Sequence, residues 1–189
     1  MDDILIPIKI YKASENILIR PLVKSDLPAL EWEGEYTRFR NVFSDLYMKI
    51  ENGVAKAWVA VAQESYMVGQ VFLQLTSDRL ELANGWNRAY LYSFRIRPAY
   101  RNKGLGTKMH SVLENALIEL NFTRLTLNVA RDNKRAIRLY HRLGFHVVAD
   151  EPGVWTFPDH NGVLQTVCEP SWRMEKSLKS TDQHPISAL

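Results

Sequence analysis

Two segments constrain the fold of this chain more than any others: Tyr90–Gly106 and Asn133–Phe145. The first is rich in aromatic residues and then enters a basic turn with two glycines, which predicts a strand, a tight turn and a helix. The second predicts a short helix, because asparagine caps helix starts and Gly144 permits the left-handed conformation that follows many last turns. Together they predict a pocket for an anion with a phenol close to it.

The basic turn has the features of a phosphate site. Gly104 and Gly106 permit close approach of an anion to the backbone at a helix N-terminus, and Arg101 and Lys103 add positive charge. A Rossmann fingerprint requires a third glycine where Met109 stands, and the glycine spacing of a Walker loop also differs. The turn therefore indicates another class of phosphate site. The alternative is a glycine-rich helix start that binds nothing.

Length and composition indicate one domain, expected over residues 1–178, followed by a loose tail at 179–189. The single cysteine, Cys168, excludes an internal disulfide and suits a reducing compartment. The N-terminus lacks the basic start and continuous apolar core of a signal peptide. No apolar run approaches the ~20 residues of a membrane span. We therefore expect a cytoplasmic protein without a membrane partner.

Charge is unevenly distributed along the chain. Residues 88–113 contain six Arg or Lys and no acid, whereas residues 25–37 contain four acids and no Arg or Lys. A basic centre suits an anionic ligand and an acidic lip suits a cationic one. The alternative is that both runs are solvated faces.

The periodicity predicts an ordered series of elements. We expect strands at 17–21, 57–62, 67–75, 89–96, 125–129, 145–149, 154–157, 163–168 and 172–178, and helices that begin at Ser25, cover 36–51, cover 105–120 and run from Asp132 or Asn133 to Gly144. Asn161-Gly162 predicts a hairpin between the two strands beside it. The order predicts an α/β (α+β) fold with a mixed, mostly antiparallel central sheet and helices on both faces.

Both constraining segments resemble motifs of one family. The turn Arg101-x-x-Gly104-x-Gly106 is similar to motif A of the GCN5-related N-acetyltransferases (GNAT), and Asn133-x-x-Ala136-x-x-x-Tyr140-x-x-x-Gly144-Phe145 is similar to their motif B. The two motifs occur in the family's order and separation, and the resemblance spans roughly residues 57–178.

The resemblance implies acetyl-CoA as cosubstrate and assigns its contacts. Strand residues Phe94, Arg95 and Ile96 would offer backbone groups to the pantetheine arm; Arg101, Asn102, Lys103, Gly104, Leu105, Gly106 and Thr107 would hold the pyrophosphate; Asn133 and Tyr140 would reach the pantetheine and the sulfur. The strands that contain Ile96 and Leu125 would splay apart to admit the cofactor.

Tyr140 is the expected general acid. A phenol with a pKa near ~10 keeps its proton at neutral pH and can give it to a departing thiolate. The Ile96 N–H is expected to polarise the thioester carbonyl. Some relatives carry a glutamate base where this chain has Asn128, which cannot act as a base. Glu33 and Glu35 are the candidate bases, and a structural role at an exposed helix end is the alternative for each.

The leading functional hypothesis is an acetyl-CoA-dependent N-acetyltransferase acting on a primary amine of a small molecule, a peptide or a protein. The second is a CoA-binding regulatory or partner-docking domain with little or no catalysis, which Asn128 favours. Nucleic-acid binding is not expected, because stacking aromatics do not alternate with the basic residues. The five histidines lack ligand spacing, so no metal site is expected.

The late hairpin, with Trp155 and Phe157, has two interpretations. Its aromatic residues either cover the sheet or form a wall of the acceptor pocket. The hairpin is also the expected place for a homodimer contact, if the protein forms one.

Overall fold

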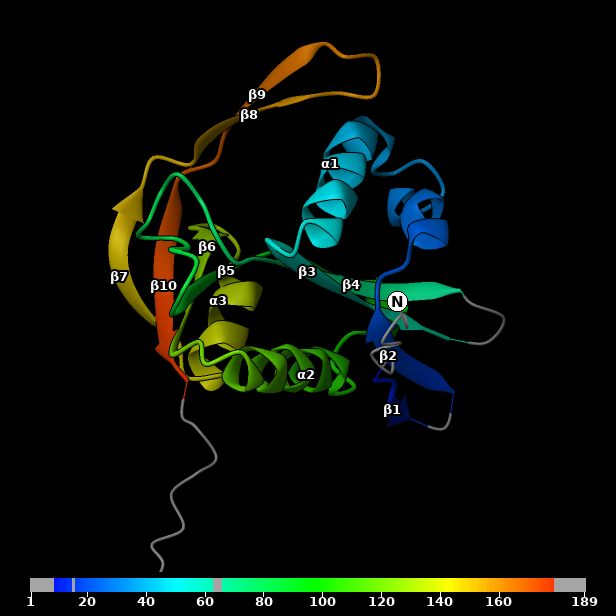
Figure 1. The fold of residues 1–189 in the computed structure, drawn as a ribbon, viewed down its shortest axis with the longest axis horizontal. Coiled ribbons are helices and arrows are strands. Elements are labelled where there is room, and N and C mark those ends of the chain that lie inside the picture. Colours follow the sequence, from blue (N-terminus) through cyan, green and yellow to red (C-terminus); the bar gives the residue numbers. More distant parts are fainter. Residues whose placement is uncertain (1–8, 15, 63–65, 179–189) are drawn as a thin grey trace, which may run out of the picture.

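The computed structural model describes residues 9–14, 16–62 and 66–178. A sheet of eight strands runs through it in the order β1-β2-β3-β4-β5-β6-β10-β7, and β8 and β9 form a separate hairpin (Figure 1). The strands are β1 (Tyr11–Ser14), β2 (Ile17–Pro21), β3 (Ala55–Val61), β4 (Met67–Gln74), β5 (Arg88–Ile96), β6 (Arg124–Ala130), β7 (His146–Glu151), β8 (Val154–Pro158), β9 (Leu164–Cys168) and β10 (Ser171–Ser177). Only β5 and β6 pair in parallel within it. The expected mixed, mostly antiparallel sheet is confirmed.

Helices cover both faces of this sheet, as expected (Figure 1). The helical elements are the 3-10 helices η1 (Lys24–Glu31), η2 (Thr37–Phe39) and η4 (Pro98–Tyr100) and the α-helices α1 (Arg40–Glu51), α2 (Leu105–Glu119) and α3 (Lys134–Arg142). On one face, Phe43 of α1 packs in a buried cluster with Phe72 of β4. On the other, Met109 and Leu113 of α2 belong to a second cluster with Leu127 of β6. The sheet thus separates two apolar cores.

The parallel pair is short, and its two strands then part. β5 and β6 are paired from Arg88 with Arg124 to Leu91 with Leu127. Beyond these residues each strand continues alone on that side, β5 to Ile96 and β6 to Ala130. The backbone groups of β5 that face the gap are therefore available to a ligand.

A bulge in β5 coincides with the parting of the strands. Tyr92 pairs with Phe72 of β4, and Arg95 pairs with Gln70, so three steps along β5 correspond to two along β4. Ser93 lies inside this bulge with φ +49°. Bulges bend a strand and increase its local twist. The bulge therefore turns the end of β5 away from β6.

Buried leucines fix the two strands up to the point of parting. Leu91, Leu125 and Leu127 are almost fully buried beneath α2, whose Leu113 and Leu117 are also inaccessible. Each buried side chain of this size contributes about 1.5–3 kcal/mol. The paired end of β5 and β6 is consequently rigid.

Three local expectations were wrong. The first helix does not start with Ser25 as its cap; the Asp26 carboxylate instead accepts the Val23 N–H at 2.9 Å and pairs with Arg20. The helix expected over 36–51 becomes α-helical only at Arg40, because a 3-10 turn precedes it. β1 was not expected at all. The cap of α3 is Asn133, whose side chain accepts the Ala136 N–H at 3.1 Å.

The hairpin β8–β9 forms as expected, and its aromatic residues pack against Phe39 of η2. The Asp159 carboxylate accepts the N–H groups of Asn161 and Val163, which orders the turn. The Phe157 ring lies 4.7 Å from the Phe39 ring, and the Trp155 ring lies 6.2 Å from it. These aromatics therefore cover η2 just before α1, and Phe157 belongs to the buried cluster that α1 shares with β3 and β4. The expected tail at 179–189 lies outside the described residues.

The backbone contact at the base of the hairpin can be tested by substitution. Gly153 has φ +68°, and a Cβ there would lie 1.8 Å from the Glu169 carbonyl oxygen. We expect Gly153→Ala to lower the free energy of unfolding by about 3 kcal/mol or more, because strain and a backbone clash add. Gly162, with φ +82° and open space around it, is the control: Gly162→Ala should cost only about 1 kcal/mol. Urea unfolding measures the free energy of unfolding of both variants, and equal losses would contradict the close contact of Gly153 with the Glu169 carbonyl.

Candidate active site

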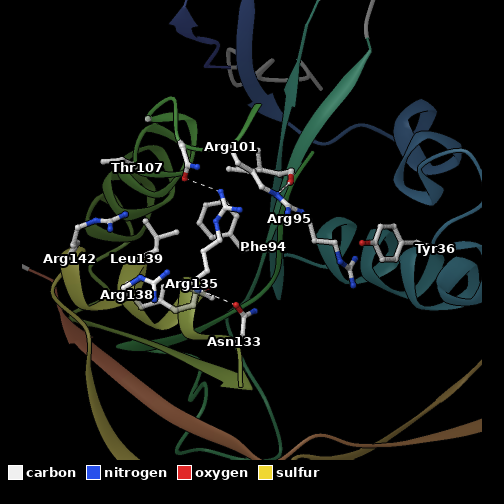
Figure 2. Close-up of a pocket in the computed structure, with 16 residues that line it drawn as sticks. Tyr36, Phe94, Arg95, Arg101, Thr107, Asn133, Arg135, Arg138, Leu139 and Arg142 are labelled. Carbon is white, nitrogen blue, oxygen red and sulfur yellow. Dashed lines mark hydrogen bonds between the residues drawn. The ribbon is translucent and has the colours of Figure 1, made fainter. Parts of the chain in front are cut away.

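A cavity of about 790 Å³ opens where β5 and β6 part. It extends from α2 and α3 to the 3-10 segment before α1, with Thr107 and Arg142 at one end and Tyr36 at the other (Figure 2). The lining residues are Tyr36, Phe94, Arg95, Ile96, Arg101, Asn102, Gly104, Gly106, Thr107, Asn133, Arg135, Ala136, Arg138, Leu139, Tyr140 and Arg142. The cavity brings together most of the residues that the two sequence motifs predict.

Two of the predicted turn residues do not line the cavity. Lys103 is exposed, and Leu105 is buried in the core with 4% of its surface accessible. Leu105 anchors the first turn of α2, and this position holds its neighbours in place. The other predicted residues of the strand, the turn and α3 all contribute to the lining.

The N-terminus of α2 presents unpaired N–H groups at the cavity. The first hydrogen bond of the helix runs from the Lys108 N–H to the Gly104 carbonyl, so the N–H groups before it have no partner within the helix. Gly104 has φ +79°, which glycine adopts without strain. Gly106 faces Ile96, at a distance that leaves room for no larger side chain without a shift. This end of the cavity suits an anionic group.

Side-chain hydrogen bonds hold the turn in place. The Arg101 Nε donates to the Ile96 carbonyl at 2.6 Å, and the Arg135 guanidinium donates to the Asn102 side chain at 2.9 Å (Figure 2). The first bond joins the turn to β5, and the second joins it to α3. Arg101 retains its terminal nitrogens for a ligand.

Three arginines of α3 extend the basic surface. Arg135, Arg138 and Arg142 are spaced by three and four residues and therefore share a helix face. The sequence analysis missed them, although this spacing is itself a detectable signal. With Arg95 and Arg101 they make five arginines in the lining, which contains no acid.

Tyr140 lies in the wall of the cavity and is largely buried, with 8% of its surface accessible. Its ring meets Phe145 edge to face at 5.7 Å between centroids. Burial raises the pKa of Tyr140 well above its usual value, and the nearby Tyr90 contributes in the same direction. Burial also raises the pKa of Tyr90 to about 12. Both phenols therefore remain protonated near neutral pH.

The residues considered as bases lie in different surroundings. Glu33 is mostly exposed and forms an ion pair with Arg97 at 2.8 Å. Glu35 is exposed and lies near the Tyr36 hydroxyl, whose pKa burial and then this carboxylate raise. Neither glutamate lines the cavity. Asn128 stands on β6 just beyond the point of parting, with a buried side-chain oxygen that has no partner among the described residues.

The other acids of residues 25–37 form ion pairs. Asp26 pairs with Arg20 at 2.6 Å, and Glu31 pairs with Arg40 at 2.6 Å. The interpretation of this stretch as an acidic lip is therefore wrong for these two carboxylates, since arginines just outside the stretch neutralise them.

Comparison with known proteins identifies the family. A family model described as "Acetyltransferase (GNAT) family" matches residues 21–145. The chain belongs to the GNAT family.

Relatives of this GNAT protein cover it in part. It is 37% identical over 85 residues to the uncharacterized N-acetyltransferase YdgE of Bacillus subtilis, which covers 39% of this chain and 54% of that relative. It is 27% identical over 148 residues to the spermidine N(1)-acetyltransferase of Escherichia coli K12, which covers 71% of this chain and 75% of that one. The chain thus spans about half the length of YdgE.

A solved structure shares the fold. The spermidine N-acetyltransferase of Vibrio cholerae, in complex with CoA and spermine, superposes with a TM-score of 0.62 at 18% identity, covering 88% of this chain and 98% of that one. No helix among the described residues is long and apolar enough to cross a membrane.

The burial of Tyr140 has a spectroscopic consequence. Because its folded-state pKa is raised, the phenol stays neutral where an exposed tyrosine ionises near pH 10. Absorbance titrations of the wild type and Tyr140→Phe should therefore coincide up to about pH 11. The contribution of the neutral phenol to stability is present below its unfolded pKa and is lost only as the pH rises through the folded value. One fewer tyrosinate in Tyr140→Phe near pH 10 would contradict this burial.

Proposed function

We propose that this GNAT protein transfers the acetyl group of acetyl-CoA to a primary amine. The observation that carries the proposal is one continuous cavity that joins the glycine turn of α2, the end of β5 beyond its pairing with β6, and the Tyr140 phenol. A pyrophosphate, an extended arm and a thioester require these three environments in this order. The family membership supports the same reaction.

The residues present fit the charges of CoA. The unpaired N–H groups of Gly104–Thr107 and the arginines Arg101, Arg135, Arg138 and Arg142 would hold its phosphates. Phe94 and Ile96 would bind the amide groups of the pantetheine as an added strand does, since β5 has no neighbour on that side. Asn133 also lines this path, although its side chain caps α3.

In the proposed reaction the amine nitrogen attacks the thioester carbon. A C–N bond forms and the C–S bond breaks, and the departing thiolate takes the Tyr140 proton, which water then restores. Burial keeps the phenol protonated, so that its O–H can donate a hydrogen bond to the thiolate as negative charge develops there and then transfer the proton. The Ile96 N–H, on the strand edge that faces the gap, would polarise the carbonyl oxygen.

The proton that the amine loses requires a separate acceptor. Asn128 cannot act as a base. Of the two candidate glutamates, we favour Glu35 acting through water, because Glu33 is held by Arg97 and Glu35 lies beside Tyr36 at the far end of the cavity.

Removal of the phenol tests the reaction. We expect Tyr140→Phe to lower kcat by about 10²-fold or more, because the thiolate loses its proton donor. The Kd for acetyl-CoA should change by less than about fivefold, since one hydrogen bond is lost at most. Release of free thiol with a panel of amines gives kcat, and calorimetry gives Kd.

The same panel distinguishes the second candidate, a CoA-binding docking domain, which Asn128 favours. Tight CoA binding by the wild type, with no turnover of any amine, would contradict the transferase and favour the docking domain.

The arginines of α3 give a test of the phosphate site. We expect Arg138→Gln and Arg142→Gln together to weaken CoA binding by about tenfold, with a loss that shrinks at high salt, because both groups are exposed. Lys134→Gln removes one positive charge from the same helix at a position outside the cavity, and it should leave the Kd for CoA unchanged. Equal effects of Lys134→Gln and the arginine pair would contradict a defined site.

A further inference from the structure

The far end of the cavity holds an arginine without an acidic partner. The Arg95 guanidinium lies 4.2 Å from the Tyr36 ring centroid and 5.5 Å from that of Phe39 (Figure 2). Its Nη1 is buried and has no hydrogen-bond partner among the described residues. Desolvation lowers the pKa of Arg95 from its ordinary value, and the neighbouring Arg38 adds to this. A buried charge without a partner is costly unless a ligand supplies one.

A second unpaired polar group lies next to it. Gln70 of β4 is directly opposite Arg95 in the antiparallel register, so both side chains emerge on the same face of the sheet. Gln70 is completely buried, and neither its amide nitrogen nor its oxygen has a partner within the described residues. Two such neighbours are unusual in a folded interior. Arg95 lines the cavity and Gln70 lies behind the lining, so a group bound in the cavity can accept a hydrogen bond from Arg95.

The surrounding charges favour an anion at this place. The cavity lining contains no Asp or Glu, and Glu33 is paired with Arg97. The exposed Glu35 carboxylate raises the pKa of Arg95, whereas the positive charge of Arg38 lowers this pKa and has the larger effect. A polyamine would bring further positive charge to a site that already holds an unpaired guanidinium.

We propose that Arg95, supported by Gln70, binds a carboxylate of the acceptor, so that the amine substrate is of the amino-acid type and not a polyamine. A carboxylate can accept two parallel hydrogen bonds from a guanidinium, and the Gln70 amide oxygen can accept one from behind it and so orient it. The inference rests on the proposed acetyl transfer for the ligand's role as acceptor, but its anion site can be tested without turnover.

The experiment compares matched acceptors. Leucine, phenylalanine and lysine are assayed beside their carboxamides, their decarboxylated amines and spermidine, with the wild type, Arg95→Gln and the control Arg38→Gln. We expect the wild type to prefer the carboxylates. Arg95→Gln should lower kcat/KM for the carboxylates by about 10- to 100-fold, mainly through KM. It should change kcat/KM for the analogues that lack the carboxylate by less than about threefold. Arg38→Gln should change kcat/KM for every acceptor by less than about threefold.

Binding of N-acetylleucine to the CoA complex, followed by calorimetry, gives a readout without turnover. Arg95-dependent binding with no turnover of any amine would sustain the anion site and remove the proposed transferase. Preference for spermidine and decarboxylated amines, unchanged in Arg95→Gln, would overturn the anion site and leave the transferase intact. An equal loss for all acceptors, with a lowered unfolding midpoint, would assign Arg95 a structural role and also overturn the proposal.

Discussion

The limited pairing of β5 and β6 is the constraint on which the rest of this structure depends. Hydrogen bonds between them stop at Leu91 and Leu127, while both strands continue. A gap in the middle of a sheet exposes backbone polar groups, which is costly in a dry interior but useful where a ligand with amide groups can pair with them. The bulge at Ser93 and the buried leucines beneath α2 keep the gap open at one end and closed at the other.

Because the gap passes through the sheet, it connects two environments of different chemistry. On the α2 and α3 side, glycine turns, helix N–H groups and arginines meet. On the α1 side, the aromatic rings of Tyr36 and Phe39 lie against Arg95. The proposed transfer uses both sides, with the cosubstrate on the α2 and α3 side and the amine acceptor on the α1 side. Tyr140 belongs to the first side and faces the junction.

Local signals in the sequence sufficed for the first side of the site and not for the second. Gly104, Gly106, Asn133 and Tyr140 are placed by turn and helix geometry, so their spacing and the resemblance to the GNAT motifs together predict where they lie. Arg95, by contrast, meets Tyr36 and Gln70 only because η2, β4 and β5 pack together, which no local pattern encodes. The ion pair of Glu33 with Arg97 also joins residues that are far apart along the chain. The interpretation of the acids as a free lip was wrong for Asp26 and Glu31 for another reason, because their arginine partners lie just outside the acidic stretch.

The position of β10 determines when the central sheet of this protein can close. Although it comes last among the strands, it inserts between β6 and β7, and α3 spans the connection between those two neighbours. During synthesis β6 must therefore remain an open edge until Ser171–Ser177 has left the ribosome, and contacts that join distant parts of a chain form slowly. The cavity wall that carries Tyr140 lies on the helix between β6 and β7, so the sheet that supports this wall closes only after β10 has been made.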